Sequence, residues 1–242
     1  MINSKQNSNV KFIKSLQTKK GRMQEGCYLV EGEKMVKEAF LAKKAVKLVL
    51  GEAEKVKNYL SCTKTIETTR EILEYCCDAV TPQGICAAVE FDSKMPDYSG
   101  NIVLLDGVSD PGNMGTIIRT CAAVGIKTLI LVNCCDPYSP KCVRSSMSGI
   151  FHVSIEELDY ETAVSRVSGK DIIVADMSGE NIFKFSSNNF CLVVGSEAHG
   201  VSAFMREKAT KTVAIPMKNT MESLNAGVSC SIILYELSKN NI

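Results

Sequence analysis

Uninterrupted apolar segments after residue 100 constrain the fold of this chain more than any other feature. Strands that are apolar on both sides are buried on both faces, which is typical of a parallel sheet covered by helices. Segments with helical periodicity alternate with these strands. We therefore expect an α/β fold with a mostly parallel sheet. The expected strands are residues 102–105, 128–132, 172–175, 191–194 and 213–215, and the expected helices are 113–124, 141–149, 160–167, 203–208 and a C-terminal one.

The segment that follows the last of these strands contains an unexpected glycine. A proline ends the strand, a polar loop is expected at 218–222, and Ser223 or Asn225 can then cap the C-terminal helix. Gly227 lies early in that helix, where glycine costs about 1 kcal/mol relative to alanine. Such a residue is tolerated where another helix, another chain or a ligand approaches the backbone closely.

The first 92 residues predict a smaller α/β unit of their own. Its expected helices are residues 3–20, 32–42, 52–60 and 69–77, and its expected strands are 27–30, 46–50, 63–66 and 85–91. The polar stretch at 93–100 contains proline and glycine and has no periodicity, which is typical of a linker. The predicted organisation is therefore a small domain (1–92), a linker (93–100) and a larger domain (101–242).

Composition and spacing argue against several classes of protein. No apolar run approaches the ~20 residues that span a bilayer, and the N-terminus lacks the apolar core of a signal peptide, so we expect a cytoplasmic protein that is not in a membrane. The eleven cysteines include no C-x-x-C pair, and the chain has two histidines. We therefore expect neither a metal site nor a disulfide framework.

Positive charge is concentrated at the N-terminus, although the whole chain carries a net charge of only +1. Residues 1–50 contain eleven Lys or Arg against four Glu. This asymmetry suggests a basic arm or face directed at a polyanion such as RNA. A solvated, lysine-rich helical surface explains the same pattern equally well.

Polar loops rich in glycine, asparagine and serine follow three of the expected strands, at residues 106–119, 195–200 and 215–225. Ligands of open parallel sheets bind at the carboxyl ends of the strands, so these loops are candidate site segments. None of them has the glycine spacing of a dinucleotide-binding turn or of a P-loop, and Gly195-Ser196 is not part of a nucleophile elbow. Nicotinamide, nucleoside triphosphate and serine-hydrolase chemistry therefore lack their usual signatures.

Taken together, the segments 110–119, 194–202 and 215–225 resemble the three ordered motifs of the SpoU (TrmH) branch of the SPOUT RNA methyltransferases. Residues 136–151 are similar to the middle segment of that family, and residues 8–50 are more weakly similar to its small N-terminal domain. The resemblance implies a parallel-sheet SPOUT fold whose C-terminal segment forms a deep trefoil knot, preceded by a small α/β RNA substrate-binding domain. It also implies a homodimer.

The function implied by this resemblance is transfer of a methyl group from S-adenosylmethionine to a ribose 2′-hydroxyl of structured RNA, above all 23S-type rRNA. A tRNA 2′-O-methyltransferase and a non-catalytic RNA-binding protein on the same fold remain as alternatives. The implied catalytic residues are Arg119, Asn113, Glu197, Ser223 and Asn225. The implied cofactor-binding residues are Val194, Gly195, Ser196, Gly200, Ile215, Pro216, Met217, Ser223 and Leu224.

Arg119 is the residue on which the implied chemistry depends most. A ribose hydroxyl is a poor nucleophile, so it must be deprotonated or held in line with the methyl group. Because arginine keeps its proton in proteins, an orienting role for Arg119 is favoured over that of a base. Basic side chains that could contact RNA phosphates are Lys11, Lys14, Lys19, Lys20, Arg22, Lys141 and Arg144.

Overall fold

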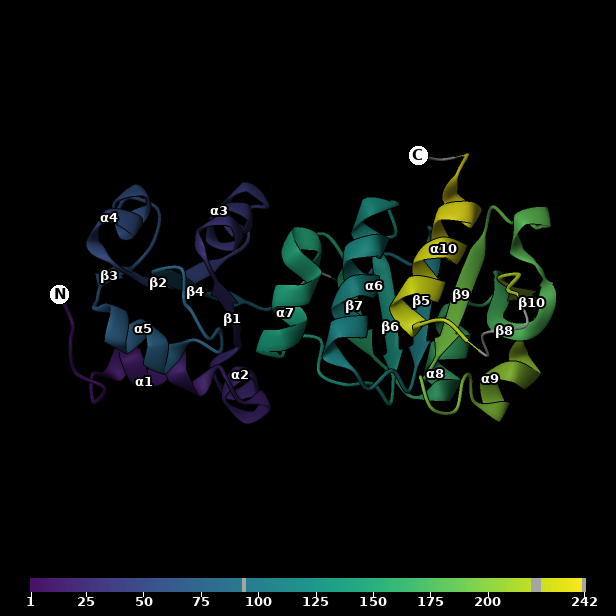
Figure 1. Cartoon of the computed structure of the whole chain (residues 1–242), viewed down its shortest axis with the longest axis horizontal. Helices are drawn as coiled ribbons and strands as arrows, with labels where there is room; N and C mark the ends of the chain where they lie inside the picture. Colours follow the sequence, from purple (N-terminus) through teal and green to yellow (C-terminus); the bar gives the residue numbers. More distant parts are fainter. Residues whose placement is uncertain (93–94, 219–222, 241–242) are drawn as a thin grey trace. The chain divides into compact units, whose positions relative to one another are not determined.

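The chain folds into two compact units, drawn in Figure 1. A computed structural model describes residues 1–92, 95–218 and 223–240. Of the loop expected at 218–222, residues 219–222 lie outside the described residues. Of the linker expected at 93–100, residues 93 and 94 do so. One unit consists of Met1–Ser93 and Asp136–Phe151, and the other of Lys94–Cys135 and His152–Ile242.

The N-terminal unit is built on a mixed sheet. Its strands are β1 (Cys27–Glu31), β2 (Val46–Gly51), β3 (Thr65–Glu67) and β4 (Ile85–Glu90). They lie in the order β1-β4-β2-β3, with β4 antiparallel to both neighbours and β2 parallel to β3. Its helices are α1 (Ser8–Ser15), α2 (Lys19–Glu25), α3 (Glu33–Leu41), α4 (Ala53–Val56), α5 (Arg70–Cys76) and α7 (Pro140–Ser146), with 3₁₀ turns η1 (Lys57–Tyr59) and η2 (Met147–Phe151).

The single helix expected at residues 3–20 is wrong, because two helices stand there. The Thr18 side chain caps α2 by accepting a hydrogen bond from the backbone N–H of Gly21 at 3.1 Å. Gly21 therefore lies inside α2. A Cβ at Gly21 would lie 2.0 Å from the carbonyl oxygen of Ser15, so glycine allows α2 to fold back against the end of α1.

The C-terminal unit contains the predicted parallel sheet. Its strands are β5 (Ile102–Asp106), β6 (Thr128–Val132), β7 (Ser154–Glu157), β8 (Asp171–Asn181), β9 (Phe190–Gly195) and β10 (Lys211–Ala214). Their order is β10-β8-β9-β5-β6-β7, and every neighbouring pair is parallel. The helices are α6 (Pro111–Ala123), α8 (Tyr160–Arg166), α9 (Ala203–Lys208) and α10 (Ala226–Ser238), with the 3₁₀ turn η3 (Ile182–Lys184).

The strand order brings two motif loops to the same place. The chain proceeds from β5 outward through β6 to β7 and then returns to the other side of β5, so β9 becomes its second neighbour. Asp106, the last residue of β5, pairs in register with Gly195, the last residue of β9. The carboxyl ends of these strands form the switch point of the sheet, where ligands bind in open α/β folds.

Helices cover the two faces of this sheet. Ala163 of α8 and Met205 of α9 share one core cluster with Leu104 and Val193. Since side chains alternate along a strand, Val103 and Leu105 face the opposite side of the sheet. Figure 1 shows α6 and α10 side by side, and these two helices pack against each other.

A neighbouring helix explains the early glycine of α10. A Cβ at Gly227 would lie 3.2 Å from the Cβ and Cγ2 atoms of Thr116 on α6, which is tighter than ordinary van der Waals contact. One turn further on, the hydroxyls of Thr120 and Ser231 share a hydrogen bond of 2.8 Å. Of the three possibilities that the sequence left open, the structure therefore shows a second helix at this position.

The pairing of β10 with β8 contains a large irregularity. Thr212 lies opposite Val174, but the next residue, Val213, lies opposite Glu180. Residues 175–179, called the bulge loop below, therefore leave the ladder between the two strands. Gly179 closes this loop against β10, because a Cβ there would lie 2.5 Å from the backbone nitrogen of Val213.

Two further findings concern membranes and metals. No helix in the described part of the chain is long and apolar enough to cross a membrane. Among residues 1–92, 95–218 and 223–240, no three or more His, Cys, Asp or Glu residues are grouped so that they could hold a metal ion.

Candidate active site

The first motif places its polar residues at the start of α6. The Asp110 carboxylate caps this helix by accepting a hydrogen bond from the backbone N–H of Asn113 at 2.9 Å, and Pro111 occupies the first turn. An aspartate cap followed by proline is a strong helix-initiating pattern, because it satisfies a free N–H group and fixes the backbone. The Asn113 side chain is thereby held at the carboxyl edge of the sheet.

Three segments that are far apart in the sequence meet at this edge through hydrogen bonds. Asn113 Nδ2 donates to Glu197 Oε1 at 2.6 Å, and Asn225 Nδ2 donates to Asn113 Oδ1 at 2.8 Å. The hydroxyl of Ser109 donates to Glu197 Oε2 at 3.4 Å. Asn225 Oδ1 accepts from the backbone N–H of Val228 at 3.2 Å and so caps α10. We call Asn113, Glu197 and Asn225 the amide–carboxylate network.

The charge of Glu197 fixes the orientation of this network. Burial raises the pKa of Glu197, but the hydrogen bonds from Asn113, Ser109 and the backbone outweigh it, and the pKa lies below its usual value. Glu197 is therefore ionised at neutral pH and only accepts hydrogen bonds. Asn113 must present its NH₂ group to the carboxylate, which leaves its oxygen facing the NH₂ group of Asn225.

A tight turn after β9 carries Glu197. Ser196 and Gly200 exchange two backbone hydrogen bonds of 3.0 and 2.9 Å, which fold residues 196–200 back on the strand end. A Cβ at Gly195 would lie 2.0 Å from the carbonyl carbon of Gly200, so only glycine fits below this turn. Sequence reasoning assigned no role to Asp106, yet this buried carboxylate accepts the backbone N–H of Ser202 at 2.7 Å and anchors the end of the turn.

A pocket opens beside the bulge loop of β8 and the carboxyl end of β10. It includes four predicted cofactor-binding residues: Ile215, Met217, Ser223 and Leu224. Pro216 lines an adjoining groove together with Lys218. The described lining of either contains none of the predicted residues Val194, Gly195, Ser196 and Gly200. Residues 175–177 of the bulge loop also line the pocket. Sequence analysis did not predict them, although the expected strand 172–175 ends there.

Two predicted catalytic residues stand apart from the amide–carboxylate network. Arg119 is exposed on α6, and its side chain has no hydrogen-bond or ion-pair partner among the residues that the structure describes. Ser223 is exposed and contributes to the pocket lining. The structure thus brings together Asn113, Glu197 and Asn225 and leaves Arg119 accessible.

The predicted RNA-binding residues of α1 and α2 differ in exposure. Lys11, Lys19 and Lys20 are exposed. The Lys14 ammonium group donates to the carbonyl oxygen of Tyr75 at 2.7 Å. The Arg22 side chain is only 4% exposed; it donates to the carbonyl oxygen of Leu16 at 2.7 Å and forms an ion pair with Asp136. Burial of Arg22 favours a structural role in the N-terminal unit over contact with a phosphate.

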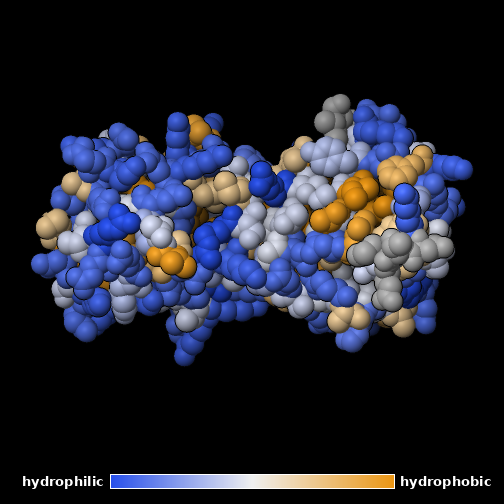
Figure 2. All heavy atoms as spheres, in the orientation of Figure 1, coloured by the Kyte–Doolittle hydropathy of each residue, from blue (hydrophilic) through white to orange (hydrophobic). Residues whose placement is uncertain are grey.

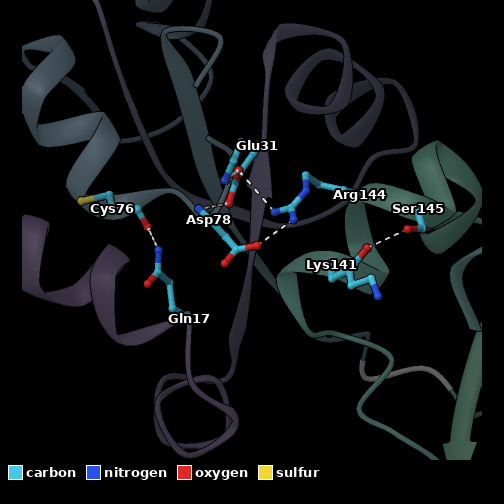
Figure 3. Close-up of polar contacts among 8 residues, drawn as sticks. Gln17, Glu31, Cys76, Asp78, Lys141, Arg144 and Ser145 are labelled. Atoms are coloured by element: carbon cyan, nitrogen blue, oxygen red, sulfur yellow. Dashed lines mark hydrogen bonds and ion pairs between the residues drawn. The ribbon is translucent and has the colours of Figure 1, made fainter. Parts of the chain in front are cut away.

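Arg144 of α7 is engaged in a second set of ionic contacts within the same unit (Figure 3). Its guanidinium lies 2.6 Å from Asp78 Oδ2 and 3.8 Å from Glu31 Oε2. Glu31 also accepts hydrogen bonds from the backbone N–H groups of Asp78 and Ala79 at 2.8 and 3.1 Å. Figure 3 shows the Lys141 side chain extending away from this cluster. Arg144 therefore helps to fix the segment Asp136–Phe151 to the N-terminal unit.

The ion pair between Arg22 and Asp136 gives a stability prediction. Replacing Asp136 by asparagine leaves the buried guanidinium without a counter-charge, so we expect the free energy of unfolding to fall by about 1.5–3 kcal/mol. Urea unfolding followed by circular dichroism measures this change. The exposed pair of Lys57 and Glu54 supplies the control, because Glu54→Gln should change stability by less than ~0.5 kcal/mol. Equal effects of the two substitutions would contradict a structural role for Arg22.

Comparison with known proteins decides the family. The model of the SpoU rRNA Methylase family matches residues 100–235, which contain all three motif segments. The chain belongs to the SpoU family. The model of the MRM3-like substrate binding domain matches residues 7–87, at the position of the predicted small domain. The resemblance read from the sequence is thereby confirmed.

One curated relative is similar along nearly the whole chain, and another along about two thirds of it. The 23S rRNA (guanosine(2553)-2′-O)-methyltransferase RlmP of Bacillus subtilis (strain 168) is 30% identical over 248 residues, covering 98% of each chain. The 23S rRNA (uridine(2479)-2′-O)-methyltransferase of Streptomyces viridochromogenes is 33% identical, covering 66% of this chain and 62% of the relative.

Solved structures of SpoU relatives confirm the predicted fold class. An AdoMet-bound rRNA methyltransferase from Sinorhizobium meliloti is 25% identical and superimposes with a TM-score of 0.89, covering 100% of this chain and 98% of that one. The SpoU methyltransferase AviRb from Streptomyces viridochromogenes, in complex with AdoMet, is 26% identical with a TM-score of 0.86, covering 97% and 98%. The chain therefore has the parallel-sheet SPOUT fold preceded by a small substrate-binding domain.

Proposed function

We propose that this chain is an S-adenosylmethionine-dependent methyltransferase that modifies a ribose 2′-hydroxyl of 23S-type rRNA in the cytoplasm. The observation that carries the proposal is the amide–carboxylate network, because it joins the three motif segments of a SpoU chain. Asn225 in this network directly follows Ser223 and Leu224, which line the pocket. Similarity over 98% of both chains to a 23S rRNA 2′-O-methyltransferase of Bacillus subtilis supports the choice of substrate.

The pocket between β8, β10 and α10 has the character that a nucleoside-containing methyl donor requires. Ile215, Met217 and Leu224 offer apolar surface for the adenine ring, and Ser223 offers a hydroxyl for hydrogen bonding. The backbone of residues 215–217 runs along this lining beyond the end of β10. These residues fit S-adenosylmethionine, which supplies an electrophilic methyl group when bound. The other predicted cofactor-binding residues would act indirectly, by shaping the turn at residues 196–200 next to the donor pocket. These residues are Val194, Gly195, Ser196 and Gly200.

The acceptor side of the reaction requires orientation of the ribose. Asn113 and Asn225, whose amides are oriented by the hydrogen bonds with Glu197 and with each other, would hydrogen-bond ribose oxygens. The accessible Arg119 side chain would hold the 2′-oxygen and the adjacent phosphate in line with the methyl group. Because a guanidinium keeps its charge, it would stabilise the 2′-oxygen while this oxygen loses its proton to solvent and bonds to the methyl carbon, whose bond to the donor sulfur breaks.

The N-terminal unit is proposed to bind the RNA. Its exposed Lys11, Lys19 and Lys20 are suited to contact phosphates, which fix the position of a nucleic acid without reading its sequence. Lys14 and Lys141 complete the proposed basic set. Arg22 and Arg144 are proposed to act indirectly, because their ion pairs hold the segment Asp136–Phe151 in the unit.

A trefoil knot in the C-terminal unit is part of the same proposal. The close approach of Gly179 to Val213 and the displacement of the bulge loop from the ladder are supporting features, since a chain crossing requires close contact between backbones. The SPOUT fold implies such a knot, which is a known exception to the rule against knotted chains.

We also propose that the protein is a homodimer through the outer face of α10. Val228 and Tyr235 on this helix are 46% and 51% exposed, and Ile232 lies between them at helical spacing. Figure 2 shows hydrophobic side chains gathered over α10. Exposed apolar surface of this kind is typical of an interaction site. The position of Arg119 on the adjacent α6 would bring this side chain close to a second copy.

Mapping of ribose methylation across total RNA tests the proposed function. RNA from cells that have the protein and from cells that lack it is compared by 2′-O-methyl sequencing, and we expect one modified nucleotide of 23S rRNA to lose its methyl group. A lost site in tRNA would overturn the substrate but not the chemistry. The enzyme proposal fails if no ribose methylation changes and the purified protein binds no S-adenosylmethionine in calorimetry.

A further inference from the structure

Arg206 of α9 connects two loops at the carboxyl edge of the sheet. Its Nη1 atom lies 2.5 Å from Asp176 Oδ2 in the bulge loop, and its Nε atom donates to the carbonyl oxygen of Val201 at 2.9 Å. The guanidinium also lies against Gly200, where a Cβ would be 3.2 Å from Nη2. One side chain therefore contacts the bulge loop and the turn that carries Glu197.

The second carboxylate oxygen of Asp176 accepts hydrogen bonds within the bulge loop itself. This Oδ1 atom accepts the backbone N–H of Ser178 at 3.0 Å and the hydroxyl of the same serine at 2.7 Å. The pKa of Asp176 is lowered by the backbone hydrogen bond from Ser178, against the opposing effect of burial, and further by Ser178 Oγ and by Arg206. Asp176 is therefore a carboxylate at neutral pH, and its side chain, 19% exposed, lines the pocket.

The bulge loop depends on side-chain contacts for its position. Residues 175–179 are outside the β8–β10 ladder, so strand pairing does not hold them. An isolated ion pair at a surface contributes little, because ordering two long side chains offsets the attraction. Here the Asp176 carboxylate is already ordered by Ser178, and the Arg206 guanidinium is already ordered by Val201. Formation of the ion pair therefore costs little additional side-chain entropy.

We propose that Arg206 is a positioning residue that couples the bulge loop to the turn at 196–200 and thereby sets the affinity for the methyl donor. This inference rests on the proposed function, in which the pocket lined by Asp176 holds S-adenosylmethionine. Arg206 does not line the pocket, so it acts through Asp176 and through the backbone of Gly200 and Val201.

Substitutions in the full-length protein test the coupling. Arg206→Gln and Asp176→Asn should each raise the KM and the calorimetric Kd for S-adenosylmethionine about 3–10-fold. Because Arg206 does not line the pocket, Arg206→Gln should keep kcat within about twofold of that of the unsubstituted protein. The double variant should be no weaker than the worse single variant, because both remove the same contact. Lys208→Gln, the same loss of charge on the same helix, is the matched control and should leave the KM unchanged.

A readout that does not depend on the donor separates this inference from the proposed function. Hydrogen–deuterium exchange of the Arg206→Gln variant should increase in residues 175–179 and 196–200 together. If the unsubstituted protein binds S-adenosylmethionine but both variants bind it equally well, the inference is wrong and the function stands. If the unsubstituted protein does not bind S-adenosylmethionine, the proposed function is wrong, and so is the proposed effect of Arg206 on donor affinity. Unchanged exchange in both segments would refute the coupling itself.

Discussion

Replacing Arg119 by alanine is expected to lower kcat for methyl transfer about 10²–10³-fold, the usual loss when a donor to a reacting oxygen is removed. The affinity for S-adenosylmethionine should stay within about twofold, because Arg119 is not among the residues that line the pocket. Its side chain is exposed and unpaired among the described residues, so the substitution removes no fold contact that the structure shows. Single-turnover methylation of rRNA fragments at saturating donor measures this effect.

Two further variants sharpen the prediction for Arg119. Arg119→Lys keeps the charge but loses the planar, two-pronged donor, so its rate should fall between those of the unsubstituted protein and the alanine variant. Arg166→Ala, on α8, removes another exposed arginine of the same unit and should leave kcat unchanged. A rate for Arg119→Ala equal to that of Arg166→Ala would remove Arg119 from the mechanism.

The contact between the three motif segments could be predicted from the sequence because it follows from a general property of parallel sheets. Polar residues after buried strands gather at one edge, and the family resemblance selected Asn113, Glu197 and Asn225 among them. The bulge loop could not be predicted in the same way. Polar residues at 178–181 have no apolar alternation, so the sequence ended β8 at residue 175 although the strand extends to Asn181.

Ion pairs between residues far apart in the chain also could not be predicted from a single sequence. Arg22 was interpreted as a member of a basic face, yet its partner Asp136 lies 114 residues away. Local periodicity carries no information about such a pair, and neither does net charge. The same limit applies to Arg144, whose partners Asp78 and Glu31 belong to segments that precede the expected linker. The short strand β7 was missed because its four residues are half-buried or exposed and mostly polar.

Gly195 is the position where the smallest chemical change should have the largest structural effect. Alanine at this site would place a Cβ 2.0 Å from the carbonyl carbon of Gly200, 2.2 Å from the nitrogen of Val201 and 2.3 Å from the oxygen of Gly200. All three are backbone atoms of a turn that is closed by two hydrogen bonds with Ser196, so no side chain can rotate away. We expect Gly195→Ala to lower the free energy of unfolding by about 4 kcal/mol, at the upper end of single substitutions.

Urea unfolding of Gly195→Ala and Gly100→Ala measures this difference. A Cβ at Gly100 would meet nothing within 4 Å, so the same chemical change there should be neutral or stabilising by up to about 1 kcal/mol. The displaced turn carries Glu197, so Gly195→Ala should also weaken methyl transfer under conditions where the variant is folded. Equal stability of the two variants would show that the turn does not fold back on β9, and without that turn Glu197 would not reach Asn113.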